Sequence, residues 1–147
     1  MTSPAPLTTA EVLLVEDDPG DVLLTREAFA QHHQGARLHV VGDGEEALRF
    51  VGRTGDFAGA PRPTLVLLDL NLPRRSGLEV LADLKADPDL RTIPVVVLTT
   101  SQAEQDILRS YQLHTNAYIV KPIDVDQFSE AIGQIDDFFL TLAAQPH

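Results

Sequence analysis

Three segments of this sequence run through apolar residues into polar side chains that could bind a ligand. Glu16 and Asp17 close the first, Asp69 closes the second, and Thr99 closes the third. Two carboxylates about 4 Å apart repel by roughly 4 kcal/mol at an effective dielectric constant of 20. A divalent cation would relieve that repulsion, and a few oxygen ligands suit Mg²⁺, which keeps several of its waters. If these segments lie side by side, the sequence predicts a magnesium site.

Strand and helix patterns alternate five times along the chain, and this alternation must bring those side chains together. The expected strands are Val12–Glu16, Arg37–Val41, Leu65–Asp69, Pro94–Leu98 and Ala117–Val120. The expected helices are Val22–Phe29, Asp43–Val51, Gly77–Ala86, Ser101–Leu113 and a long one from Asp124 toward Leu142. Apolar strands that alternate with helices predict a parallel sheet covered on both faces, a doubly wound α/β fold.

Short polar residues mark where several helices should begin. Ser76, with Glu79 three residues later, is typical of a capping box, and Asp18 is better placed to cap the first helix than to bind a metal. The Asp43–Gly44 pair should open the second helix. Between that helix and the third strand, the Gly- and Pro-rich residues 52–63 predict a loop without regular structure.

Ligands of such sheets bind beyond the carboxyl ends of the strands, where the strand order reverses. At this edge, four segments resemble the signatures of response-regulator receiver domains: LLVEDD, LVLLDLNLPRRSGLEVL, VVVLTTS and YIVKP. The resemblance covers about residues 11–142 and implies a flavodoxin-like, five-stranded sheet in the order 2-1-3-4-5 with five helices. More narrowly, GDFAGAPRP, LKADPDL and LHTNAYIVKP resemble the small regulators paired with bacterial and cyanobacterial phytochromes.

The resemblance implies a role for each polar residue at the strand ends. Asp69 would accept a phosphoryl group from the phosphohistidine of a sensor histidine kinase, possibly of the phytochrome type, as carboxylates do in covalent intermediates. Mg²⁺ would be held by the carboxylates of Glu16, Asp17 and Asp69 and by the backbone carbonyl of Asn71. The remaining roles concern charge and switching: Lys121 neutralises phosphoryl oxygens, Thr99 hydrogen-bonds the phosphoryl group, and Tyr118 rotates inward, unless it simply packs.

Rival classes fit these motifs less well. A phosphatase of the haloacid-dehalogenase type needs a second acid two residues after its nucleophile, where this chain has Asn71. A calcium loop fails at Pro73 and Arg74, and a nucleotide-binding domain would need a Gly-rich loop where EDDPGD stands. A degenerate receiver that binds partners without phosphorylation is an alternative that labelling by acetyl phosphate would test. We therefore expect a signalling protein that acts on itself rather than an enzyme.

The composition of the chain argues against some classes of binding partner. The 147 residues carry a formal net charge of −11 and no cysteine, so phosphate backbones repel the chain and disulfides are excluded. With no apolar run long enough to span a membrane and no secretory signal, we expect a cytoplasmic protein without a nucleic-acid or membrane partner. The expected organisation is a mobile segment at 1–9, a receiver domain at 10–143 and a tail at 144–147.

The last helix predicts self-association. At 1.5 Å per residue it would be about 30 Å long, whereas a five-residue strand covers about 17 Å. Phe138 lies at the edge of its apolar stripe and Leu140 faces away from it. We expect a symmetric homodimer through this helix and the last strand. The stripe itself consists of Val125, Phe128, Ile132, Ile135, Phe139 and Leu142.

Overall fold

The computed structural model describes residues 10–32, 35–70, 72, 76–99, 117–120 and 130. Its centre is a five-stranded sheet in the order β2-β1-β3-β4-β5, and every neighbouring pair is parallel. This is the predicted order. The strands are β1 (Glu11–Val15), β2 (Arg37–Val41), β3 (Leu65–Asp69), β4 (Val95–Thr99) and β5 (Ala117–Val120).

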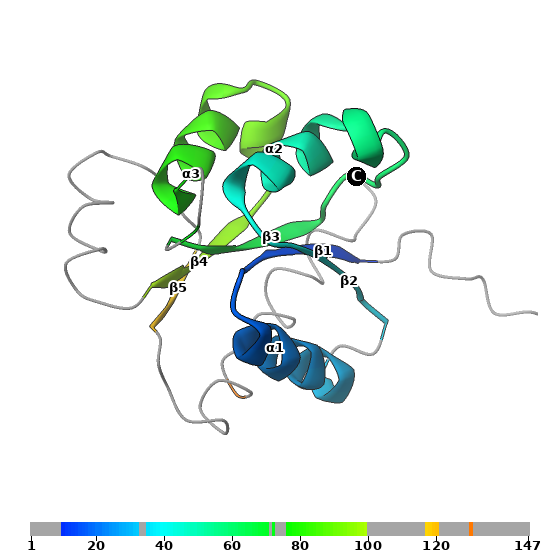
Figure 1. Ribbon diagram of the computed structural model, residues 1–147, viewed down its shortest axis with the longest axis vertical. Coiled ribbons are helices and arrows are strands. Elements are labelled where there is room, and N and C mark those ends of the chain that lie inside the picture. Colours follow the sequence, from blue (N-terminus) through cyan, green and yellow to red (C-terminus); the bar gives the residue numbers. More distant parts are fainter. Residues whose placement is uncertain are drawn as a thin grey trace, which may run out of the picture.

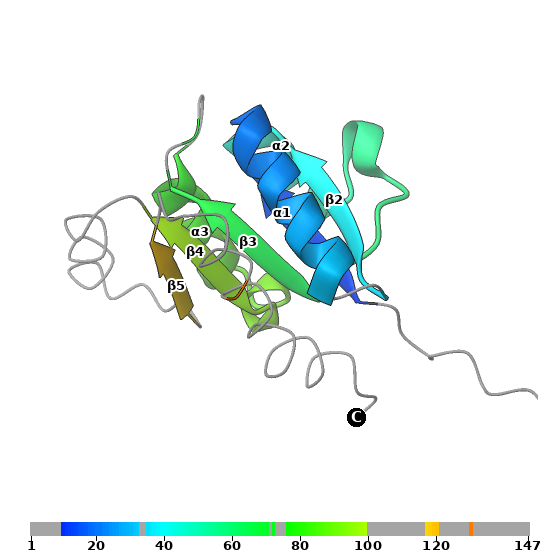
Figure 2. The ribbon, with the colours of Figure 1, turned by 90° about the horizontal axis from the view of Figure 1, so that it is seen from below.

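Helices cover both faces of the sheet. The helix α1 (Pro19–His32) lies on one face, and α2 (Gly44–Gly52) and α3 (Gly77–Ala86) lie on the other (Figures 1 and 2). This arrangement is the doubly wound architecture that the alternation predicted. The two further helices that we expected, at 101–113 and 124–142, lie outside the described residues, except that Glu130 is helical.

The alternation of side chains along each strand divides the core into two layers. In β1, Leu13 and Val15 pack with the cluster beneath α2 and α3, whereas Val12 and Leu14 pack with the cluster beneath α1. Successive side chains of a strand point to opposite faces, so one apolar run serves both layers. All five residues of β3 are buried, as expected for the central strand of a sheet covered on both sides.

Two predicted helix starts, those at Asp43 and Ser76, are confirmed, whereas α1 begins at Pro19, before the expected Val22. Asp43 caps α2 by accepting a hydrogen bond from the Glu46 N–H, with a distance of 2.8 Å. Ser76 caps α3, because its hydroxyl accepts from the Glu79 N–H at 3.2 Å. These caps satisfy N–H groups that have no partner within the helix, and they fix where each helix begins.

The prediction for residues 52–63 was wrong in part. Two short 3₁₀ helices occur in the described chain, η1 (Gly55–Phe57) within this loop and η2 (Leu90–Thr92) after α3. Phe57 packs against Phe50 of α2, with ring centroids 5.5 Å apart. This tertiary contact gives the segment a place on the core, which its Gly and Pro content could not reveal.

Candidate functional site

Three carboxylates converge at the carboxyl edge of the sheet. Glu16 and Asp17 directly follow β1, and Asp69 is the last residue of β3, the strand that pairs with β1 in parallel. One carboxylate oxygen from each residue lies within 4.8 Å of the other two. The parallel register produces this meeting, because Val15 pairs with Leu68 and the next residue of each strand is therefore adjacent.

The three carboxylates differ in their exposure. Glu16 is 2% exposed and Asp69 is 3% exposed, whereas Asp17 is open to solvent. The Glu16 N–H donates to the Val41 carbonyl at 3.0 Å, and its carboxylate accepts from the Asp17 N–H at 3.1 Å. Buried carboxylates are rare unless they are paired or bind a cation. Two anchored, buried acids beside an accessible third form a small open cluster of oxygen ligands.

Asp18 has the structural role that we predicted for it. Its carboxylate accepts a hydrogen bond of 2.9 Å from the Asp21 N–H, and its carbonyl accepts from the Val22 N–H at 3.0 Å. Asp18 therefore caps α1, with Pro19 at the first helical position, where proline lacks only an N–H that would have no partner in the helix. Two adjacent acids thus have separate roles, since Asp17 belongs to the cluster.

The other predicted site residues are described in part or not at all. Thr99 ends β4, and its backbone pairs with Val120 of β5; Tyr118 pairs with Val97. Both residues lie on the expected strands, but their side chains are outside the part of the chain that the structure describes. Asn71 and Lys121 are also outside the described residues. Their assigned roles stay predictions.

Sequence reasoning missed Gly77, the first residue of α3. Its N–H donates to the Leu70 carbonyl at 3.2 Å, directly after Asp69. A Cβ atom at this position would lie 2.3 Å from the Asp69 carbonyl oxygen. A glycine at the start of a helix is a weak signal by itself, and only the fold reveals which backbone it approaches.

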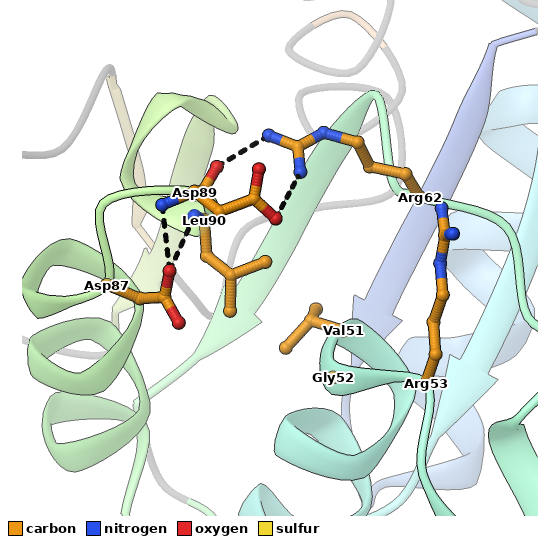
Figure 3. Close-up of a pocket in the computed structure, with 7 residues that line it drawn as sticks. All are labelled: Val51, Gly52, Arg53, Arg62, Asp87, Asp89 and Leu90. Carbon is orange, nitrogen blue, oxygen red and sulfur yellow. Dashed lines mark hydrogen bonds and ion pairs between the residues drawn. The ribbon is translucent and has the colours of Figure 1, made fainter.

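A hollow lies at the other end of the strands and is separate from the carboxylates. It encloses about 480 Å³ between the end of α2 and the start of η2 (Figure 3). Arg62 bridges its rim: the guanidinium donates to the Asp89 carbonyl at 2.7 Å and lies 3.2 Å from the Asp89 carboxylate. The segments lining this hollow precede β3 and β4, so they lie away from the carboxyl edge.

The carboxylate cluster fits a small divalent cation. All three ligands are oxygens, and they come from two strands whose backbones are fixed by the sheet. Mg²⁺ and Mn²⁺ prefer carboxylate, carbonyl and water oxygens. Within the described residues, no helix combines the length and apolar character that crossing a lipid bilayer requires.

A parallel sheet in this order, with acids beside the ends of β1 and β3, agrees with the receiver class of protein that the sequence resembles. The chain belongs to the response-regulator receiver family, since the sequence model of that family, the response regulator receiver domain, matches residues 12–133. The predicted family is therefore confirmed.

The similar proteins include phytochrome response regulators. The chain is 42% identical to the response regulator Rcp1 of Synechocystis over 135 residues, which are 92% of each chain. It resembles the phosphorylated cyanobacterial phytochrome response regulator RcpA with a TM-score of 0.85 and 44% identity, covering 95% of this chain and 100% of RcpA. The Mn²⁺-bound form of Rcp1 gives a TM-score of 0.82 and 40% identity, and the match covers 94% of this chain and 99% of Rcp1.

Proposed function

We propose that this chain is a phosphorylation-activated switch of phytochrome signalling, with Asp69 as the phosphoacceptor. The observation that carries the proposal is the meeting of the Glu16, Asp17 and Asp69 carboxylates within 4.8 Å at the ends of adjacent strands. Asp69 has the position that an acceptor requires: it ends the central strand and lies beside two other acids. The similarity to RcpA, whose structure is that of a phosphorylated phytochrome regulator, supports this role.

Mg²⁺ is the cation that we propose for the cluster. The carboxylates of Glu16, Asp17 and Asp69 and the backbone carbonyl of Asn71 would hold it. When bound, the cation supplies positive charge that offsets the charge on the phosphoryl oxygens. The Mn²⁺-bound form of Rcp1 supports a divalent ion of this size, and Mg²⁺ accepts the same oxygen ligands.

The chain's own residues provide the acceptor and its charge balance. A carboxylate oxygen of Asp69 attacks the phosphorus of a phosphohistidine; the new P–O bond forms as the P–N bond breaks, and the imidazole keeps the electron pair. Lys121 would place an ammonium group near the phosphoryl oxygens. Thr99 would hydrogen-bond the phosphoryl group, and Tyr118 would fill the space that Thr99 leaves. Such a switch shifts the populations of conformations already present.

The proposed partner is a sensor histidine kinase of the phytochrome type. Its support is the similarity to the cyanobacterial phytochrome response regulator RcpA. Signal output would run through contacts with other proteins, including a second copy of this chain, in the cytoplasm. Direct binding to DNA is disfavoured by the net charge of −11.

Labelling tests the acceptor. The parent should take up an acid-stable, base-labile phosphoryl group from acetyl phosphate and from a phytochrome kinase in the presence of Mg²⁺. Asp69→Asn should abolish the label and keep the fold, because the amide is nearly isosteric with the carboxylate. Asp56→Asn, which removes the same charge from an exposed position in η1, is the matched control and should label like the parent. Undiminished label in Asp69→Asn would refute the assignment.

A further inference from the structure

Gly77 lies against the backbone at the end of β3. A Cβ atom built on it would be 2.3 Å from the Asp69 carbonyl oxygen and 2.5 Å from the Cα of Leu70. Carbon–oxygen contacts in proteins are ordinarily about 3.3–3.6 Å. Any side chain at this position would therefore require α3 and the end of β3 to separate by about 1 Å.

Neither partner can move away freely. Three fully buried side chains, Val80, Leu81 and Leu84, anchor α3 in the core beneath it. On the other side, β3 is paired with both β1 and β4, and the Leu70 N–H donates to the Leu98 carbonyl at 3.2 Å. Close-packed interiors transmit a displacement rather than absorb it. If α3 and β3 were forced apart, the backbone between them, which includes Asp69, would therefore be displaced.

We propose that Gly77 is a positioning residue for the phosphoacceptor. Because Gly77 has only a hydrogen atom as its side chain, α3 can begin directly against the Asp69 backbone. The Gly77 N–H donates to the Leu70 carbonyl at 3.2 Å. This contact fixes the position of the Asp69 carboxylate relative to the carboxylates of Glu16 and Asp17. The inference rests on the proposed function in one respect, that the positioned carboxylate binds the cation and accepts the phosphoryl group.

Gly77→Ala tests the proposal with three readouts. Amide chemical shifts of Asp69 and Leu70 in the metal-free protein should move, because the backbone there is displaced. Affinity for Mg²⁺, measured by calorimetric titration, should fall roughly 10–100-fold, the range seen when groups that orient metal ligands are lost. The rate of labelling by acetyl phosphate at saturating Mg²⁺ should fall about 100-fold, as a 1 Å misplacement can cause.

Two control variants separate positioning from stability. Gly59→Ala makes the same substitution where no atom lies within 4 Å of the added Cβ. Leu84→Ala weakens the packing of the same helix at its far end, where Leu84 is 1% exposed. When folded, as judged by circular dichroism, both should bind Mg²⁺ and label like the parent.

The outcomes are distinguishable. A folded Gly77→Ala with unchanged shifts and Mg²⁺ affinity would overturn the positioning role, whereas moved shifts with a parent that never labels would refute the proposed function instead. If Gly77→Ala folds only in an osmolyte such as trimethylamine N-oxide, all proteins are titrated in it. If it stays unfolded even there while Leu84→Ala folds, Gly77 serves the fold as a whole and the proposal fails.

Discussion

A carboxylate oxygen of Glu16 lies within 4.8 Å of one of Asp69, although Glu16 follows β1 and Asp69 ends β3. Both side chains are almost fully buried, at 2% and 3% exposure. Two unit charges at this separation repel by about 3–4 kcal/mol at an effective dielectric constant of 20. The parallel register of β1 and β3 holds them together against this repulsion, so the cluster suits a divalent cation.

The neighbouring acids Asp17 and Asp18 should respond differently to substitution. Asp17→Asn should weaken Mg²⁺ binding at least about tenfold and leave stability without metal unchanged or raised by up to about 1 kcal/mol, because it removes a like charge. Asp18→Ala should cost about 1 kcal/mol of stability, since it removes the cap of α1. Calorimetric Mg²⁺ titration and urea denaturation measure the two effects.

Asp18→Asn is the matched control for Asp17→Asn. It removes the same charge one residue away, and asparagine caps helices about as well as aspartate. It should therefore change neither stability nor Mg²⁺ affinity by much. Equal losses of Mg²⁺ affinity in the two variants would mean that net charge, rather than the geometry of Asp17, governs binding.

The sequence predicted much of this arrangement, and the reason is local. The run Leu65–Asp69 was recognisable because every residue but the last is apolar, and the structure buries all five. Once five such units alternate with helices, the acids after β1 and β3 must meet at one edge. Caps such as Ser76 were equally predictable, because their hydrogen bonds lie within three residues.

Contacts that depend on how individual loops and helices pack were not predictable. Phe57 gives η1 its place by packing on Phe50, and Arg62 reaches Asp89 and Thr92 across the hollow at the far edge. The close approach of Gly77 to Asp69 depends on how α3 descends onto β3. No periodicity or propensity encodes such distances, so single residues gave no signal until the fold placed them.

The contacts of Arg62 predict a measurable stabilisation. Its guanidinium donates to the Asp89 carbonyl and to the Thr92 hydroxyl, and it pairs with the Asp89 carboxylate. Arg62→Lys cannot reproduce the fork and should lower stability by up to about 1 kcal/mol, since the pair is exposed. Arg53→Lys, at another arginine that lines the hollow (Figure 3), is the control in denaturation experiments. Equal stability of all three proteins would contradict this prediction.

Burial lowers the pKa of Lys85 from its ordinary value of 10.5. The folded state therefore disfavours the charged ammonium, and this cost is fully present below the folded pKa. As the pH rises through the folded pKa toward 10.5, the unfolded state binds more protons than the folded state, and the cost disappears. Lys85→Met should thus gain stability relative to the parent at neutral pH, and the difference should shrink in the alkaline range.

The test for Lys85 uses the slope of that difference against pH rather than its absolute size. Lys85 also donates a hydrogen bond of 3.4 Å to the Arg91 carbonyl, and the loss of this bond in Lys85→Met changes the absolute difference in stability. The direction of the slope is still set by the lowered pKa of Lys85. Urea denaturation of both proteins from pH 7 to pH 10.5 measures the slope. A difference in unfolding free energy that is constant with pH would contradict the lowered pKa.

Thr99→Ala should separate phosphoryl acceptance from switching. Thr99 ends β4, beside the strand of Asp69, so its loss leaves the carboxylate cluster intact. The variant should still accept a phosphoryl group but show a smaller spectral change at Tyr118, the expected partner of the switch. Nuclear magnetic resonance of selectively labelled tyrosine, before and after acetyl phosphate, measures the change. Identical changes in variant and parent would contradict the proposed coupling.

The predicted homodimer depends on the last helix, which lies outside the described residues except for Glu130. Glu130 is helical and exposed, in agreement with a position off the apolar stripe that begins at Val125. Phe138 is expected at the edge of that stripe and Leu140 away from it, and a helix longer than the strands would carry both past the sheet. Covering them against a second copy of the same helix gives a symmetric contact.

Sedimentation velocity at tens of micromolar protein tests this assembly. The parent should sediment as a dimer, and Phe138→Asp with Leu140→Asp should sediment as a monomer, because charges at the contact would repel and lose their hydration. Gln134→Asp with Thr141→Asp adds the same charge at polar positions of the helix and should remain dimeric. A monomeric parent, with or without acetyl phosphate and Mg²⁺, would refute the homodimer, as would a double Asp variant at 138 and 140 that stays dimeric.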